Sequence, residues 1–343
     1  MSCGLKACRD GVRWHLIETV PGEYCFESLR SQVDASRRTG MQIIWDLCHY
    51  GWPDGLDIFS PEFVDRFARM SRATARLLGS ELPGPYWFTP VNEISFFSWA
   101  AGEHALFGPF ERGRGFELKC QLIRASIAAI EAIRDEIPSA RFVQPDPLIH
   151  IVPAADASAA ARSEADGYCT AQYQAWDMLV GAVCPELGGH PRYLDIVGCN
   201  YYVHNQWVYP GGPVLDRTDT RYRPLWQMLA AVCNRYKRPL FLAETGIEDD
   251  LRPEWLAYIC DEVEKAVLNG VPVEGICLYP VVNHPGWADD RHCHNGLWDY
   301  CNNSGDRTIY NPLANELARQ QQRFGALQET LLACSAERAV TFA

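Results

Sequence analysis

Short apolar runs alternate with longer segments that have one apolar and one polar face along most of the chain. The short runs are rich in β-branched and aromatic residues, which is typical of buried strands. The longer segments repeat their apolar residues every three or four positions, as amphipathic helices do. This pattern predicts strands at 5–14, 41–47, 86–92, 141–145, 193–202, 240–244 and 273–279, and helices at 27–38, 61–78, 116–136, 165–183, 224–236 and 253–269.

Strands that alternate with helices at this spacing predict parallel pairing, because each helix carries the chain back to the same end of the sheet. The expected fold is therefore α/β with a parallel sheet and helical crossovers, and 343 residues suffice for one α/β barrel. A single domain is expected over residues 1–325, followed by a tail at 326–343 that is either a peripheral helix or frayed. Residues 154–161 are expected to form a loop.

Two of the predicted strands lead into a glutamate. Glu93 follows the run YWFTPVN at 86–92, and Glu244 follows the run PLFLA at 239–243. In a parallel α/β protein the carboxyl ends of the strands meet at one rim, so we expect the two side chains to lie close together. Two carboxyl groups at such a rim can cleave a glycosidic bond, one as acid and the other as nucleophile. The alternative is that both glutamates form surface ion pairs.

Composition narrows the classes of partner. The formal net charge is −12, which argues against nucleic acid or an anionic membrane surface as a partner.

The 14 cysteines do not have the arrangement of a disulfide framework, because Cys48, Cys199 and Cys277 lie in or beside apolar strand runs. No apolar signal segment begins the sequence, so we expect a cytoplasmic protein with mostly unpaired thiols.

Several segments together resemble family-one glycoside hydrolases, the β-glucosidase and β-galactosidase group of (β/α)8 enzymes. The resemblance runs from about residue 5 to residue 299, and its most specific part is DIVGCNYY at 195–202, which is similar to the family's sixth-strand signature. Trp87, Thr89, Asn92 and Glu93 resemble the acid/base motif of the fourth strand. The other similar segments are ETG at 244–246 (the nucleophile motif), HYGWP at 49–53 and NGLWD at 295–299.

The sequence also departs from the family's pattern. One extra residue separates Trp87 from Glu93, Ile94 replaces the usual proline, and Thr245 replaces the usual asparagine. The region at 278–284 lacks the motif with tryptophan and glutamate that commonly holds the sugar's outer hydroxyl groups. The chain is therefore interpreted as a divergent relative, and its substrate does not follow from the resemblance.

The resemblance implies a (β/α)8 TIM barrel, possibly without its first strand and helix, and a role for each matched residue. Glu244 would be the nucleophile, and Arg9 would hydrogen-bond its carboxylate; the alternative for Arg9 is an ion pair with another acid such as Asp10. Tyr202 would donate to the nucleophile, or else be a core tyrosine. Glu93 would be the acid/base, which requires a raised pKa.

The remaining candidates would bind the sugar. Asn92 would contact its 2-hydroxyl and His49 another ring hydroxyl, although a lone histidine is more often structural. Trp52, Trp287 and Trp298 are candidates for stacking on the sugar, and core packing is an equally good explanation for each of them.

The first strand of the family has no counterpart in this sequence. Residues 5–14, which include Arg9, resemble the family's second strand, so seven strands are predicted. An incomplete barrel leaves two strand edges with unpaired backbone groups, which favour aggregation or association. We therefore expect an N-terminally shortened version of a complete enzyme; the alternative is a closed barrel in which further segments supply the missing strand.

The sequence predicts neither a cofactor nor a metal site. Residues 289–294 (DDRHCH) have metal-binding side chains but no second cluster at the spacing of a zinc site. The predicted function is a retaining β-glycoside hydrolase that acts on a small-molecule or oligosaccharide β-glycoside. The alternatives are a catalytically silent carbohydrate-binding barrel and a transglycosidase of the same fold.

Overall fold

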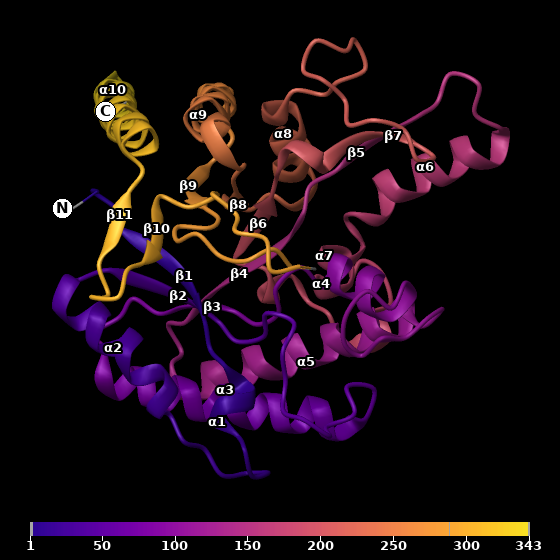
Figure 1. Ribbon diagram of the computed structural model, residues 1–343, viewed down its shortest axis with the longest axis vertical. Helices are drawn as coiled ribbons and strands as arrows, with labels where there is room; N and C mark the ends of the chain where they lie inside the picture. The colour runs from indigo at the N-terminus through magenta and orange to yellow at the C-terminus, as the bar shows by residue number, and fades with distance from the viewer. Residues whose placement is uncertain (1–2, 288, 342–343) are drawn as a thin grey trace.

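The computed structural model describes residues 3–287 and 289–341, with side chains through residue 332. Seven parallel strands form its main sheet, and helices surround them (Figure 1). In their order across the sheet, the strands are β1 (Ala7–Gly11), β2 (Gln42–Asp46), β3 (Trp87–Thr89), β4 (Arg141–Pro147), β6 (Ile196–Asn200), β8 (Leu240–Thr245) and β9 (Val273–Leu278).

The helices between the strands cover the outside of the sheet. They are α1 (Trp14–Ile17), α2 (Glu27–Thr39), α3 (Pro61–Glu81), α4 (Ile94–Phe97), α5 (Gly115–Glu136), α6 (Ala159–Ala171), α7 (Gln174–Leu179), α8 (Leu225–Tyr236) and α9 (Arg252–Leu268). The arrangement is that of a (β/α)8 TIM barrel, nearly closed, as the sequence predicts.

Local signals in the sequence account for several helix ends. Helix α3 begins at Pro61, and the Oγ of Ser60 accepts a hydrogen bond from the backbone N–H of Phe63 at 3.3 Å. Helix α2 ends at Gly40, whose φ of 68° is a left-handed conformation that glycine adopts without strain. The start of α3 and the end of α2 therefore follow from the residues at those positions.

Strands β1 and β9 lie at the two ends of the seven-strand order. They approach each other, because the backbone of Arg9 in β1 hydrogen-bonds the thiol of Cys277 in β9. Helix α10 (Asn311–Thr341) packs beside α9, and Gln321 on it donates to the backbone carbonyl of Cys3 at 2.8 Å. The C-terminal helix therefore packs against both the N-terminal segment and α9.

Some predicted boundaries are wrong. Helix α6 begins at Ala159, inside the segment expected to be a loop, and the single helix expected at 165–183 is divided into α6 and α7. Residues 326–341, expected to be either a peripheral helix or frayed, continue α10 as a helix.

Two small sheets were not predicted, β5 (His150–Pro153) with β7 (Gln206–Tyr209) and β10 (Trp298–Cys301) with β11 (Arg307–Ile309). Cys48, Cys199 and Cys277 are free thiols, as the sequence predicts. Within the described residues, no helix combines the length and apolar character that crossing a membrane requires.

Candidate active site

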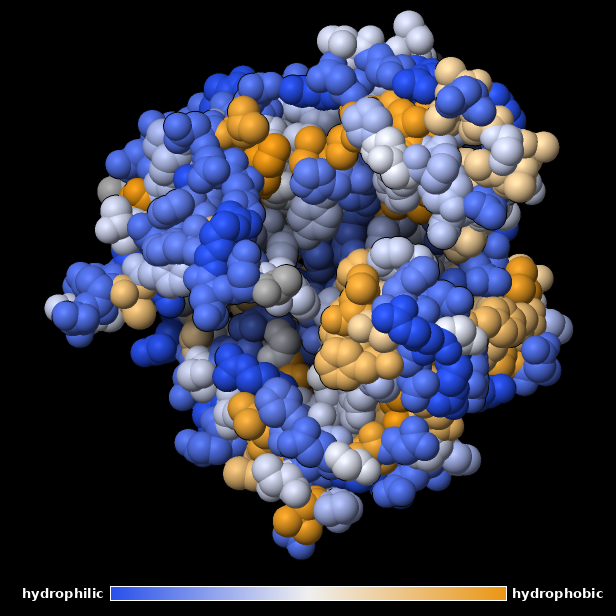
Figure 2. Space-filling view, turned by 45° about the vertical axis from the view of Figure 1, so that its right-hand side comes forward, coloured by the Kyte–Doolittle hydropathy of each residue, from blue (hydrophilic) through white to orange (hydrophobic). Residues whose placement is uncertain are grey.

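The predicted site residues meet at the carboxyl ends of the parallel strands. Glu244 lies next to the last residue of β8, and its strand partner Asn200 ends β6. Glu93 follows β3 after a short turn, and Arg9 lies in β1. The space-filling view shows a hollow in the middle of the face that it presents, bordered by apolar and polar residues (Figure 2).

Glu244 is buried and ion-paired. Nη2 of Arg9 donates to its Oε1, and the hydroxyl of Tyr202 donates to its Oε2 at 2.8 Å. Arg9 also donates to Oδ1 of Asn92 at 3.0 Å and lies 3.6 Å from Oδ2 of Asp46. Burial opposes the charge of Arg9, but the carboxylates of Glu244 and Asp46 raise its pKa above the ordinary value. Arg9 is thus a fixed positive charge beside Glu244.

Glu93 has a different environment. Its Oε2 accepts from the hydroxyl of Tyr50 at 2.5 Å, and its Oε1 accepts from Nδ2 of Asn200 at 2.8 Å. No cation is recorded within ion-pairing distance of it among the described residues. Burial, followed by the charge of Glu244, raises the pKa of Glu93 to about 7. The two carboxyl groups therefore have opposite electrostatic settings.

A continuous chain of hydrogen bonds joins the two carboxyl groups. Asn92 is its middle member: its Oδ1 accepts from Arg9, and its Nδ2 donates to the hydroxyl of Tyr50 at 3.0 Å. Arg9 then reaches Glu244, and Tyr50 reaches Glu93. Because Asn92 is completely buried, this chain fixes the two carboxyl groups relative to each other.

The backbone is strained at both residues of the Tyr50–Glu93 pair. The φ angles are 66° at Tyr50 and 46° at Glu93, in the left-handed region that side chains with a Cβ rarely adopt. Such strain persists where the surrounding structure holds it, and it is found often at functional sites.

His49 is held by Asp46, the last residue of β2. Its Nδ1 lies 2.9 Å from Oδ2 of Asp46, and its Nε2 lies 3.5 Å from Nδ2 of Asn92. Burial opposes the protonated form of His49, but the hydrogen bond and the charge of Asp46 raise its pKa overall. His49 therefore joins the glutamate network.

Three buried polar atoms around this network have no hydrogen-bond partner among the described residues. They are Nη1 of Arg9, Oδ1 of Asp46 and Oδ1 of Asn200. Buried polar atoms are almost always hydrogen-bonded in proteins, so these three atoms are exceptions.

The three candidate tryptophans have different positions. Trp287 is 68% exposed, and its ring centre lies 6.0 Å from that of Tyr50. Trp52 is partly buried against the main core, with its ring centre 6.0 Å from that of Phe97, and its Nε1 donates to the carbonyl of Leu56 at 2.9 Å. Trp298 packs in a second hydrophobic cluster under α10. Of the three, Trp287 alone combines exposure with contact to the site.

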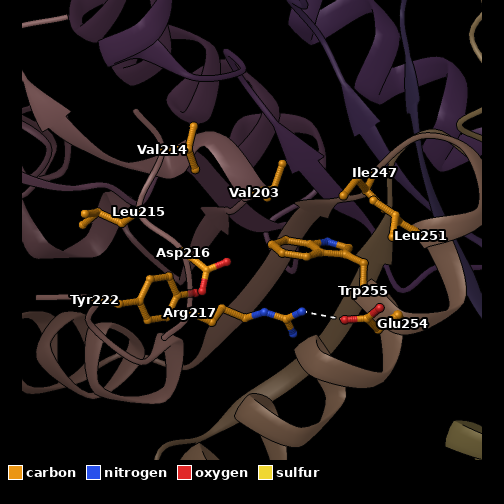
Figure 3. Close-up of a pocket in the computed structure, with 10 residues that line it drawn as sticks. All are labelled: Val203, Val214, Leu215, Asp216, Arg217, Tyr222, Ile247, Leu251, Glu254 and Trp255. Atoms are coloured by element: carbon orange, nitrogen blue, oxygen red, sulfur yellow. Dashed lines mark hydrogen bonds and ion pairs between the residues drawn. The ribbon is translucent and has the colours of Figure 1, made fainter. Parts of the chain in front are cut away.

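A pocket of about 310 Å³ adjoins the strand that carries Glu244 (Figure 3). Val203, which follows Tyr202, lines it together with Ile247 and Trp255. The indole N–H of Trp255 donates to the hydroxyl of Thr245 at 2.9 Å, so a wall of the pocket is bonded to the residue after Glu244.

Sequence analysis missed four residues of the site: Tyr50, Asn200, Asp46 and Asp146. All but Tyr50 are polar residues in a strand, at or next to its carboxyl end, which is a signal that could have identified them. Asp146 in β4 accepts from the backbone N–H of Ser95 at 3.0 Å and from its Oγ at 2.9 Å. Burial, followed by the charge of Glu93, raises the pKa of Asp146 to about 7.

Comparisons with known proteins show likeness in structure but not in sequence. No protein-family model and no curated protein matches the sequence. A β-glucosidase from Thermotoga maritima in complex with deoxynojirimycin is 17% identical, with a TM-score of 0.74 over 92% of this chain and 82% of that one. A family 1 β-glucosidase from the same organism is 17% identical, with a TM-score of 0.73 over 93% of this chain and 84% of that one. A hyperthermophilic β-glucosidase mutant is also 17% identical, with a TM-score of 0.77 over 92% of this chain and 84% of that one.

Identity at this level shows the fold alone. This chain therefore has a (β/α)8 TIM-barrel fold similar to that of the family 1 β-glucosidases.

Proposed function

We propose that this chain is a retaining β-glycoside hydrolase in which Glu244 is the nucleophile and Glu93 the acid/base. One observation carries the proposal: two buried glutamates share a hydrogen-bond chain, but only Glu244 is ion-paired with an arginine. Glycosidases need one ionised and one protonated carboxyl group, and different environments are the means of separating the two pKa values.

The chemistry takes two steps. The Glu244 carboxylate attacks the anomeric carbon and forms a glycosyl ester, while the bond to the leaving oxygen breaks and that oxygen takes the proton of Glu93. Glu93, now a carboxylate, then removes a proton from water, whose oxygen attacks the same carbon and releases Glu244. Arg9 and Tyr202 hold the attacking carboxylate in place.

The substrate class follows from the groups that face the site. The side chain of His49, which is 27% exposed beside the glutamate network, is suited to bind a hydroxyl group of a sugar. The exposed ring of Trp287 is suited to a pyranose face or an aromatic aglycone. The free thiols of Cys48, Cys199 and Cys277 fit a reducing compartment, so we place the enzyme in the cytoplasm.

A panel of aryl β-glycosides tests this function. The wild type should release the phenol from at least one of them, and Glu244→Gln should reduce the rate to background on all of them. Glu93→Gln should slow poor leaving groups by about 10²–10⁴-fold and activated aryl groups far less, because a good leaving group needs little protonation.

The outcomes separate the alternatives. Binding of sugars without turnover would favour the catalytically silent barrel. Products in which the sugar is joined to an added alcohol instead of water would favour the transglycosidase. Full activity in Glu244→Gln would overturn the assignment of the nucleophile.

A further inference from the structure

Three side chains that can bind a metal come together outside the glutamate site. His292 and His294 lie on the loop between β9 and β10, and Asp299 lies in β10. We propose that these three residues bind a divalent transition-metal ion, with Zn²⁺ as the expected ion, and that the ion ties this loop to β10. The sequence alone does not predict this site, because it shows no second cluster of ligands at the usual spacing.

The distances suit a metal ion. One ligand atom from each residue lies within 4.8 Å of the other two, and Nε2 of His292 is 3.5 Å from Oδ1 of Asp299. A tetrahedral Zn²⁺ with bonds of about 2.1 Å places its ligand atoms about 3.4 Å apart. Small rotations of the two exposed histidine side chains toward Asp299 would therefore complete the geometry.

The local backbone places the two histidines on one side. Cys293, between them, is only 2% exposed and faces inward, while both histidines are exposed. Their rings stack with centres 4.6 Å apart and planes 19° apart. The alternation of the extended chain therefore presents two imidazoles to solvent and keeps the thiol out of the ligand set.

Neighbouring residues hold the third ligand. Nδ2 of the buried Asn283 donates to Oδ1 of Asp299 at 2.9 Å, and the backbone N–H of Tyr300 donates to the same oxygen at 2.7 Å. Oδ1 of Asn283 accepts from the backbone N–H of Gly296 at 2.6 Å. The Tyr300 ring lies edge-on to His292, with ring centres 3.8 Å apart. Metal ligands in proteins are oriented by outer hydrogen bonds of this kind.

The ligand set indicates which ions would bind. Two imidazoles and one carboxylate suit Zn²⁺ and its neighbours among the transition metals, while Ca²⁺ and Mg²⁺ prefer oxygen ligands only. Three protein ligands leave a coordination position for water, as in sites that are not purely structural.

Metal binding would reinforce contacts that the loop already makes. The backbone of His292 forms an isolated antiparallel β-bridge with that of Pro285. Nη1 of Arg291 forms an ion pair with Oε2 of Glu248 at 2.6 Å. Trp287, which contacts Tyr50, lies on the same loop. The loop is the orange segment between β9 and β10 in Figure 1. The ion would join the histidines on this loop to the adjacent strand.

Zn²⁺ titration of the untagged, chelator-treated protein by calorimetry tests the site. One equivalent should bind to the wild type. His294→Ala and Asp299→Asn should each weaken binding at least about tenfold, because even loss of an outer partner of a metal ligand costs about 10–100-fold. Asp299→Asn preserves an acceptor for Asn283 and therefore the local fold. The control is His204→Ala, an exposed histidine elsewhere, which should bind Zn²⁺ as the wild type does.

Two further readouts identify the ligands. Co²⁺ in this site should give visible bands of a nitrogen- and oxygen-coordinated ion, whereas a thiolate charge-transfer band would show binding to one of the cysteines and overturn the proposal. Zn²⁺ should slow amide hydrogen exchange at 291–294 in the wild type and not in His294→Ala. Zn²⁺ affinity unchanged in both ligand variants, or no binding by the wild type, would also overturn it.

Discussion

At the scale of single residues, the site depends on unequal surroundings for two chemically identical side chains. Glu244 is paired with Arg9, while among the described residues the carboxyl group of Glu93 is bonded only to the neutral groups of Tyr50 and Asn200. Burial and the charge of Glu244 keep the pKa of Glu93 near 7. A general acid with a pKa close to the working pH is efficient, because a large fraction is protonated and its proton still transfers readily.

Tyr50→Phe should raise the pKa of Glu93. The tyrosine hydroxyl stabilises the ionised carboxylate, so its loss favours the protonated form. If Glu93 must be protonated, the wild-type kcat/KM should fall as the pH rises through about 7, and this fall should move upward by roughly 0.5–1 pH unit in the variant, as expected for one hydrogen bond of about 1 kcal/mol. A pH–rate profile measures it. Tyr86→Phe, outside the site, is the control, and a fall that stays in place or moves downward would contradict the assignment.

At the scale of elements, the sequence predicts five helices to within three residues at each end, whereas the strand expected at 5–14 is observed only as Ala7–Gly11. The strand expected at 240–244 is observed as Leu240–Thr245, because a continuous buried run leaves few alternatives. Helix α6 was missed at its start because it buries only Ala165, so no apolar face marks it. Its N-cap is the better signal: the Oγ of Ser158 accepts from the backbone N–H of Ala161 at 3.2 Å.

The sequence also identifies some residues of the site and not others. The sequence identified Glu93, Glu244 and Arg9, because the family resemblance implies a role for each of them. Tyr50 reaches Glu93 through a left-handed backbone, and Asp146 in β4 reaches the backbone of Ser95 in α4. Neither conformation follows from apolar periodicity, so the sequence could not predict these contacts.

Asp146→Asn should stabilise the protein at high pH. Because the pKa of Asp146 is raised to about 7, the folded state resists its ionisation, and stability falls as the pH rises from about 4 through 7. The amide removes this penalty, so the variant should gain a few kcal/mol at pH 8 and less than half of that at pH 5. Urea unfolding at the two pH values measures the gain. An equal effect at both would show that burial of the charge is not the cause.

At the scale of the whole molecule, the seven parallel strands are neither a fully closed ring nor a flat sheet. The number of strands agrees with the sequence prediction, and β1 and β9 end the order. Helix α10 packs next to this region through Leu313 and Leu317, which contribute to a cluster with Leu256 and Leu297. The cluster brings together α9, α10 and the segment before β10, so α10 is part of the folded barrel.

Leu317→Ala should therefore destabilise the whole protein by about 2–3 kcal/mol, the low end of the range for a buried leucine, since this cluster is small. Leu317 is 9% exposed, whereas Leu332 on the same helix is 64% exposed. Leu332→Ala should change the free energy of unfolding by less than about 0.5 kcal/mol. Chemical denaturation measures both. Equal effects of the two substitutions would contradict a structural role for this part of α10.

The most direct test of the proposed chemistry is to trap the glycosyl ester on Glu244. A panel of 2-deoxy-2-fluoro β-glycosides with good leaving groups slows both steps and allows the covalent intermediate to accumulate. Mass spectrometry of the intact protein should show the gain of one fluorosugar, and peptide mapping should locate it on Glu244. No adduct should form with Glu244→Gln. An adduct on another residue, or steady turnover of β-glycosides without any adduct, would contradict the assignment of Glu244 as the nucleophile.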